Sequence, residues 1–429
     1  MVEMVKSAKK TRTFAEPHLM DIGPSRVRSV LERALEDEAN RRDLAIIYES
    51  RCKIPGSPDD ITNEDMIAGI TEAYIAEEKK LQELVPRYSM AMADGYEATR
   101  FIASEYGVPA PDASRFKLSY GYWHFMLASI EDFLAQGRPL SKMGYMHRGD
   151  CLPTVAVALI TVSDEWDDEN RQPENVRKAH IHEGLHLMGY EVRDDDGKLI
   201  RKGIGRSGSE YGYSHGILEE GLVEFLARRY DAAYEPESTL RDYEYEVKLI
   251  NWLGKKGIPT GMLIRAHLHG ETEALERRVD DTFGGGFFEF LVGLKKGLGY
   301  GTGGIVKALT DAESIDVRVF MAIIQDRPLG QLTAPYVNDE AVEGLLAAHY
   351  RRLYLTAIPL NMPVDYQKPE ITAKREAILG QLPDPLADRI RSNPGRGWCL
   401  YNDDSREEAE EAFRTAAHEK MQEARARRR

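Results

Sequence analysis

The sequence predicts an α+β protein that is mostly helical and contains one small mixed sheet. Apolar residues recur at helical spacing through residues 24–51 and 62–108. Short segments rich in β-branched residues follow between residues 115 and 163, and helical periodicity returns from residue 217 to about residue 354. A few strands enclosed by long helical segments favour a small sheet within a helical protein.

The two N-terminal helical segments carry boundary signals of their own. Residues 24–51 open with Pro24, and proline is well tolerated in the first turn of a helix. Thr62 is a suitable N-cap for the segment 62–108, and Asp65 can complete a capping box. The linker PAPDAS at residues 109–114 then ends the helical pattern.

Strand signals occur in three segments. Residues 115–120 (RFKLSY) alternate weakly, and residues 153–163 (PTVAVALITVS) are rich in β-branched side chains. Residues 192–204 (VRDDDGKLIRKGI) predict a hairpin, because Asp196-Gly197 is a strong turn signal.

The chain is expected to divide into four parts. Residues 1–110 form an N-terminal helical region, and residues 111–235 hold the sheet and the candidate site. Residues 236–355 form a helical C-terminal subdomain. Residues 356–429 form an extension that ends in a charged helix or frayed tail, with RARRR as a solvated end.

Composition excludes several classes of function. The net charge of −14 argues against nucleic acid as a partner, because nucleic-acid binding depends on neutralising phosphates with Lys and Arg. No stretch is apolar for long enough to cross a bilayer, so no membrane partner is expected. The N-terminus lacks the apolar run of a secretory signal, and the three cysteines are far apart, so a cytoplasmic location is expected. The oligomeric state is not predicted.

The segment KAHIHEGLHLMGY at residues 178–190 contains the main candidate site. His182 and His186 are four residues apart, so on a helix both imidazoles project from one face. Glu183 adjoins His182, close enough to act on a water bound to a metal that the histidines hold. The pattern H-E-x-x-H is typical of zinc metallopeptidases, in which the glutamate is the general base. The alternative is a polar helix face whose histidines are satisfied by hydrogen bonds.

A catalytic zinc needs a third protein ligand. The extended three-histidine motif would place this ligand at position 192, where Val192 cannot bind zinc. Residues 214–230 (SHGILEEGLVEFLARRY) predict an apolar, buried helix with Glu220 and Glu224 one turn apart. Two buried carboxylates are costly without a cation or hydrogen bonds, and a zinc ion together with the N–H of a ligating histidine would satisfy both.

The two motifs together resemble the gluzincin metallopeptidases, in which H-E-x-x-H is followed by a helix often written (N/E)-E-G-x-x-E. The resemblance covers residues 154–230. It implies a zincin-like catalytic core, one zinc ion per chain, Glu220 as the third ligand and Glu224 as the partner of a ligating histidine. It also implies a peptide or protein substrate, held along residues 154–162 as an edge strand.

Two features of this resemblance leave alternatives. The spacer between the motifs is longer than in the best-known members, so Glu210, His215 and Glu219 remain alternative ligands. The family also has an oxyanion donor shortly before the third ligand. The candidates here are Tyr213, which is preferred, and also Tyr211 and His215, although either tyrosine could simply pack a loop.

Other histidines and glycines are left out of the site. His180 points away from His182 and is expected to be packed or exposed, while His267 and His269 are expected at the surface. GLGYGTGG at residues 297–304 follows a helix-like run, so a flexible loop is favoured over a nucleotide site.

Two other functions stay open. One is an inactive or metal-binding relative that serves as an interaction module, although a structural metal has no need of Glu183. The other is a zinc hydrolase that acts on a non-peptide substrate.

Overall fold

The protein is described by a computed structural model that covers residues 24–52, 57–135, 140, 149–152, 156–165, 171–195, 199–206, 216–234, 243–294, 299–311, 315–327, 329, 339–361, 369–395 and 397–427. The chain forms two compact units. The first contains Met1–Ser214, Val223–Leu240 and Ala266–Gly270, and the second contains His215–Leu222, Arg241–Arg265 and Glu271–Arg429. The expected four-part division stays a prediction.

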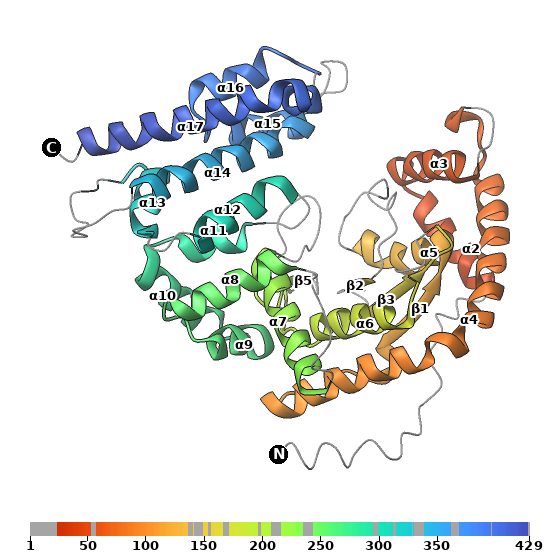
Figure 1. Ribbon diagram of the computed structural model, residues 1–429. Coiled ribbons are helices and arrows are strands. Elements are labelled where there is room, and N and C mark those ends of the chain that lie inside the picture. Colours follow the sequence, from red (N-terminus) through yellow and green to blue (C-terminus); the bar gives the residue numbers. More distant parts are fainter. Residues whose placement is uncertain are drawn as a thin grey trace. The chain divides into compact units, whose positions relative to one another are not determined.

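The described residues are mostly helical with a small mixed sheet, as predicted (Figure 1). No helix among them combines the length and the apolar character needed to cross a membrane. The helices of the first unit are α2 (Pro24–Leu35), α3 (Glu38–Cys52), η2 (Pro58–Asp60), α4 (Asn63–Tyr106), η3 (Ala113–Arg115), α5 (Gly121–Ala135), α6 (Pro173–Leu187) and most of α7 (Ile217–Tyr234).

Helix α4 is 44 residues long, and both of its ends follow local rules. The Thr62 hydroxyl accepts the Asp65 backbone N–H (3.1 Å), and the Asp65 carboxylate accepts the Thr62 backbone N–H (3.1 Å). This pair is the predicted capping box. Gly107 ends the helix at φ +68°, a left-handed conformation that glycine adopts without strain.

The main sheet has three strands in the order β1-β3-β2. β1 (Phe116–Tyr120) is parallel to β3 (Val157–Val162), and β2 (Gly149–Leu152) is antiparallel to it. β1 and β3 confirm the two predicted strand segments. The expectation that residues 154–162 form an edge strand is wrong, because β3 lies in the centre. β2 occupies that edge, and its four residues are too few to produce a periodic signal in the sequence.

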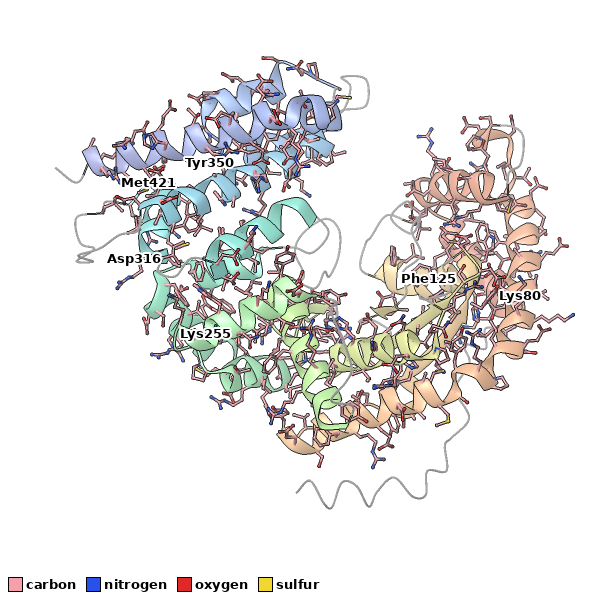
Figure 2. All side chains as sticks on the ribbon, in the orientation of Figure 1. Lys80, Phe125, Lys255, Asp316, Tyr350 and Met421 are labelled. Carbon is pink, nitrogen blue, oxygen red and sulfur yellow. The ribbon has the colours of Figure 1, made fainter. Side chains whose placement is uncertain are left out.

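Helices cover both faces of β3, which explains why all six of its residues are buried. Ile160 and Val162 cluster with residues of α4 and with Val176 of α6. Leu159 faces the other way and clusters with Phe125 of α5. Figure 2 labels Phe125. The sheet therefore holds α6 on one face through ordinary apolar packing.

A second sheet follows α6 directly. It contains β4 (Glu191–Arg193), β5 (Leu199–Lys202) and β6 (Gly205–Arg206), all antiparallel. The predicted hairpin is therefore present, although its turn at residues 196–198 lies outside the described residues. The fully buried Lys202 ammonium pairs with the Glu191 carboxylate at 2.8 Å and links β4 to β5.

The second unit consists of helices, several of which pack against α14. They are α8 (Glu244–Lys255), α9 (Thr260–His269), α10 (Thr272–Phe283), α11 (Phe287–Val292), α12 (Gly299–Asp311), α13 (Val317–Ile324), α14 (Asp339–Ala357), η7 (Ile358–Leu360), α15 (Pro369–Leu379), α16 (Asp384–Arg391), η9 (Gly397–Tyr401) and α17 (Asp403–Ala426). The last residues of α9 belong to the first unit. Residues 299–304, expected in a flexible loop, instead form the start of α12, and residues 295–298 are not described.

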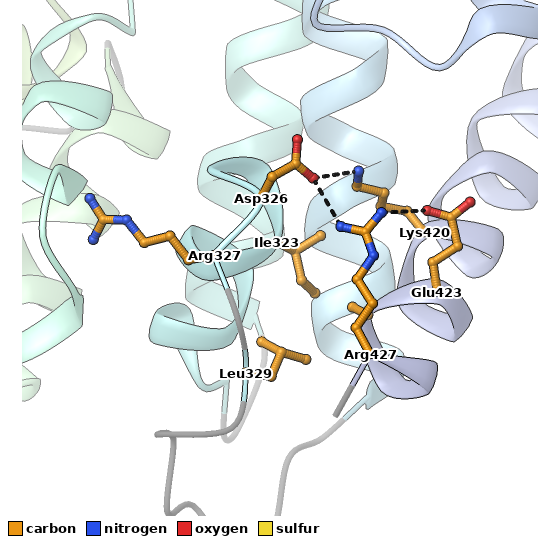
Figure 3. Close-up of a pocket in the computed structure, with 8 residues that line it drawn as sticks. Ile323, Asp326, Arg327, Leu329, Lys420, Glu423 and Arg427 are labelled. Carbon is orange, nitrogen blue, oxygen red and sulfur yellow. Dashed lines mark hydrogen bonds and ion pairs between the residues drawn. The ribbon is translucent and has the colours of Figure 1, made fainter. Parts of the chain in front are cut away.

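The charged C-terminal segment is a packed helix. Phe413 and Met421 of α17 are buried, and the Phe413 ring meets the Tyr354 ring of α14 edge-on at 5.3 Å. The basic end of α17 is held by ion pairs around a small pocket (Figure 3). There Asp326 pairs with Lys420 at 2.8 Å and lies 3.8 Å from Arg427. Of the two alternatives predicted for this segment, residues 403–426 form the helix, while Ala426 and Arg427 of the RARRR end are exposed, as expected for a solvated end.

Candidate metal centre

Helix α6 carries the H-E-x-x-H motif and is closely packed on two sides. Pro173 is its first residue, as predicted, and it ends at Leu187, two residues before Gly189. A Cβ atom at Gly184 would lie 2.5 Å from the Phe116 ring of β1 and 2.7 Å from the Thr99 hydroxyl of α4. Only a glycine lets α6 approach these neighbours so closely. The backbone that carries the two histidines is therefore fixed by packing.

His182, His186 and Glu220 come together as a buried group. Each of the three offers one ligand atom, and these atoms all lie within 4.8 Å of one another. The side chains come from α6 and from the first turns of α7, more than thirty residues later in the chain. All three are nearly excluded from solvent, with 5%, 1% and 6% of their surface exposed. The sequence-predicted ligand set is thus brought together.

This donor set fits a zinc ion. Two nitrogen ligands of a tetrahedral zinc, each bound at about 2.0–2.1 Å, lie about 3.3 Å from each other. The Nε2 atoms of His182 and His186 are 3.2 Å apart. Two imidazoles and one carboxylate also form one of the three-ligand sets that leave the fourth zinc position open for catalysis. The same distance between the two ring nitrogens also suits a hydrogen bond, so His182 and His186 can hold these positions when no metal is bound.

Glu224 and Arg228 continue the polar network away from the metal group. The Glu224 Oε2 atom lies 3.2 Å from His182 Nδ1, and Arg228 Nε donates to Glu224 Oε1 at 3.0 Å. A proton on Nδ1 that is donated to Glu224 puts the lone pair of the His182 ring on Nε2, the nitrogen that faces His186 and that a metal would bind. The structure thus places Glu224 where the resemblance implies it, against a histidine of the motif.

The first turns of α7 are held by a close backbone approach. A Cβ atom at Gly221 would lie 2.5 Å from the backbone carbonyl oxygen of Glu246 on α8. The glycine next to Glu220 therefore permits the tight crossing of the two helices. Glu219 is also buried, with 1% exposed, but it is not one of the grouped ligands.

Glu183 differs from the histidines in its exposure. Its side chain is half-buried, and it makes no hydrogen bond or ion pair within the part of the chain that the structure describes. Its carboxylate oxygens are therefore available to a water or a substrate. The candidate oxyanion donors Tyr211, Tyr213 and His215, and the alternative ligand Glu210, lie outside the described residues.

Comparison of the chain with protein-family models, with curated proteins and with solved structures finds no match.

The remaining histidines lie where packing places them. His180 is fully buried against the Phe116 ring (5.5 Å between centroids), and burial lowers its pKa to about 3. Of the two alternatives expected for His180, packed or exposed, the structure shows the packed one. His269 is exposed, as expected, but the same expectation for His267 is wrong. His267 is fully buried, and its ring N–H donates to the Leu185 carbonyl at the end of α6 (3.2 Å).

Two residues near the site were missed from the sequence. His267 sits at the end of a helix whose last turn packs in the first unit, which local periodicity does not reveal. Arg228 carried a signal, since it is four residues after Glu224 and has the opposite charge.

Proposed function

We propose that this chain is a zinc-dependent metallopeptidase that hydrolyses peptide bonds with Glu183 as general base. The observation that carries the proposal is the buried group of His182, His186 and Glu220, assembled from two motifs far apart in the sequence. Among the described residues the group offers three buried donors, and two imidazoles with one carboxylate are a ligand set found in catalytic zinc sites. A structural site normally fills all four positions with protein ligands.

Each residue has a distinct task in this proposal. His182, His186 and Glu220 hold one zinc ion, which supplies Lewis acidity and lowers the pKa of a bound water towards about 7. Glu183 accepts a proton from the attacking water and returns it to the leaving amine. Its carboxylate is half-buried and has no partner among the residues that the structure describes, which suits that role. Tyr213 is the preferred oxyanion donor, with Tyr211 and His215 as alternatives.

The substrate and the location are part of the same proposal. A peptide or protein substrate follows from the resemblance of the two motifs to those of the gluzincins. Nucleic acid is not proposed as a partner, because a chain of net charge −14 repels phosphates. A cytoplasmic location is proposed because Cys52, Cys151 and Cys399 are all free thiols.

Metal analysis combined with a peptide-library digest tests the function. The parent protein is expected to contain one zinc per chain and to cleave peptides. Glu183→Gln should keep the zinc and lose cleavage, because an amide cannot accept the proton while both imidazoles remain. His182→Ala should lose the metal itself. Glu183→Gln therefore shows the activity of a protein that keeps its metal but lacks the base, and His182→Ala shows the activity of a protein without the metal.

Three outcomes separate this proposal from its alternatives. A parent protein without bound metal, even after zinc is added, contradicts the proposal and supports the polar-face alternative. Zinc without peptide cleavage supports an interaction module or a hydrolase of another substrate. Near-normal cleavage by Glu183→Gln removes Glu183 from its role as base.

A further inference from the structure

A row of three contacts leads outward from the candidate metal group along α7. Arg228 Nε donates to Glu224 Oε1 at 3.0 Å. The other oxygen of the same carboxylate, Oε2, lies 3.2 Å from His182 Nδ1. On the far side of that ring, His182 Nε2 faces His186 Nε2 at 3.2 Å. Each oxygen of Glu224 therefore has its own partner.

This arrangement fixes the orientation of a carboxylate that would otherwise be costly to bury. Glu224 is 3% exposed, and a buried carboxylate without a cation or hydrogen bonds is strongly destabilised. Arg228 supplies the charge, while its own side chain keeps 28% of its surface exposed. A guanidinium that donates from Nε defines a direction as well as a charge. Glu224 is thus held with Oε2 turned towards His182.

We propose that Arg228 is a positioning residue for the metal centre. It acts through Glu224, which in turn fixes the His182 ring so that Nε2 points at the metal position. The inference rests on the proposed metal site, and it adds a residue that the H-E-x-x-H motif and the E-E-G-x-x-E helix do not contain. Outer partners of metal ligands tune affinity because they fix the tautomer and the orientation of the ligand.

The next residue on the helix provides a matched control. Arg229 also pairs with a carboxylate, but its partner is Glu105 of α4, and it donates to the Tyr106 hydroxyl at 2.7 Å. Arg228 and Arg229 therefore share the helix, the charge and one ion pair with a glutamate. They differ in whether that glutamate contacts a candidate ligand. A general effect of charge or helix stability would appear in both variants.

The experiment measures zinc affinity by competition with a chelator at one fixed pH. Arg228→Met keeps the length of the side chain and removes the charge, and it should weaken zinc binding by about 10-fold, at the low end of the range for outer partners of metal ligands. Arg228→Lys should recover part of the loss, because it restores the charge without the fixed direction of Nε. Arg229→Met should bind zinc as the parent does.

A double variant distinguishes positioning from general loss of structure. If Arg228 acts through Glu224, Arg228→Met should have no further effect on zinc affinity once Glu224→Ala is present. Additive losses would overturn the proposal, and so would parent-like affinity of Arg228→Met. Circular dichroism identifies any variant that does not fold. If Arg228→Met does not fold, the zinc affinity of Arg228→Lys is compared with that of the parent instead.

Failure of this inference is distinguishable from failure of the proposed function. A parent protein that binds no zinc removes both. If the parent protein binds zinc and Arg228→Met binds it equally well, only the positioning role of Arg228 is contradicted.

Discussion

The Nε2 atoms of His182 and His186 lie 3.2 Å apart on one face of α6, and Glu220 on α7 completes a group of ligand atoms within 4.8 Å of one another. Two histidines four residues apart meet on any α-helix. The third donor does not follow from helix geometry, because it depends on where α7 packs. The third ligand therefore depends on the packing of α7, whereas the two histidines depend only on the helical geometry of α6.

Alanine variants of the three neighbouring glutamates test the order of ligands. Glu220→Ala should lose zinc to a mild chelator, because a bond and a charge are removed together. Glu224→Ala should keep zinc with affinity about 10–100-fold lower, since it acts only on the orientation of His182. Glu219→Ala should match the parent. If Glu220→Ala binds zinc as tightly as the parent, the assignment is wrong, and a loss in Glu219→Ala would shift the ligand to that residue.

Gly184→Ala tests whether the close packing of α6 maintains the site. The added Cβ atom would lie 2.5 Å from the Phe116 ring and 2.7 Å from the Thr99 hydroxyl. Overpacking of this kind typically lowers the free energy of unfolding by about 1–3 kcal/mol. The control is Gly344→Ala on α14, where no atom lies within 4 Å of the added Cβ. That variant should gain about 0.5–1 kcal/mol from helix propensity. Urea unfolding of both measures the difference, and equal shifts would contradict the packing argument.

Local signals in the sequence were sufficient for features that depend on neighbouring residues. The Thr62–Asp65 capping box and the shared face of His182 and His186 are set within one helical turn. Other features depend on distant packing, and the sequence did not reveal them. The central place of β3 depends on the four-residue strand β2, and the burial of His267 depends on the packing of the end of α9 in the first unit.

Part of the site could be predicted because its chemistry restricts the choice of residues. A buried carboxylate such as Glu224 requires partners, so its contact with a histidine was implied before the structure was known. Arg228 was overlooked because oppositely charged residues four apart are common on exposed helix faces. The burial of Glu224, at 3% exposure, and its contact with His182 distinguish this pair from an ordinary surface pair.

Glu77 should make the stability of the protein depend on pH. Its carboxylate accepts the His124 backbone N–H at 2.6 Å at the start of α5, and burial raises its pKa from 4.5 to about 7. The folded state therefore holds this proton more tightly than the unfolded state does. The contribution of Glu77 to stability is fully present below pH 4.5 and is lost as pH rises to about 7.

Glu77→Gln should remove that dependence, because the amide does not titrate. The free energy of unfolding of the parent should fall by up to about 3 kcal/mol more than that of the variant between pH 4.5 and pH 7. The exposed Glu72 on the same helix gives the control variant Glu72→Gln. Urea unfolding at several pH values measures the slopes, and identical slopes for the parent and Glu77→Gln would contradict the assignment.

His267→Ala tests whether the end of α9 supports α6, the helix that carries His182 and His186. The buried ring donates to the Leu185 carbonyl, and Leu185 immediately precedes His186 in α6. Alanine leaves a cavity and removes one of the two donors to the Leu185 carbonyl, which still accepts the Met188 backbone N–H at 3.1 Å, so the free energy of unfolding should fall by about 2–4 kcal/mol. Zinc affinity should fall as well, because the last turn of α6 loses a support beside a ligand.

His269→Ala, at an exposed position on the same helix, should change neither property. His267→Asn supplies a shorter donor and should recover some stability if the hydrogen bond matters. Equal effects of His267→Ala and His269→Ala on unfolding and on zinc affinity would show that His267 gives α6 no support.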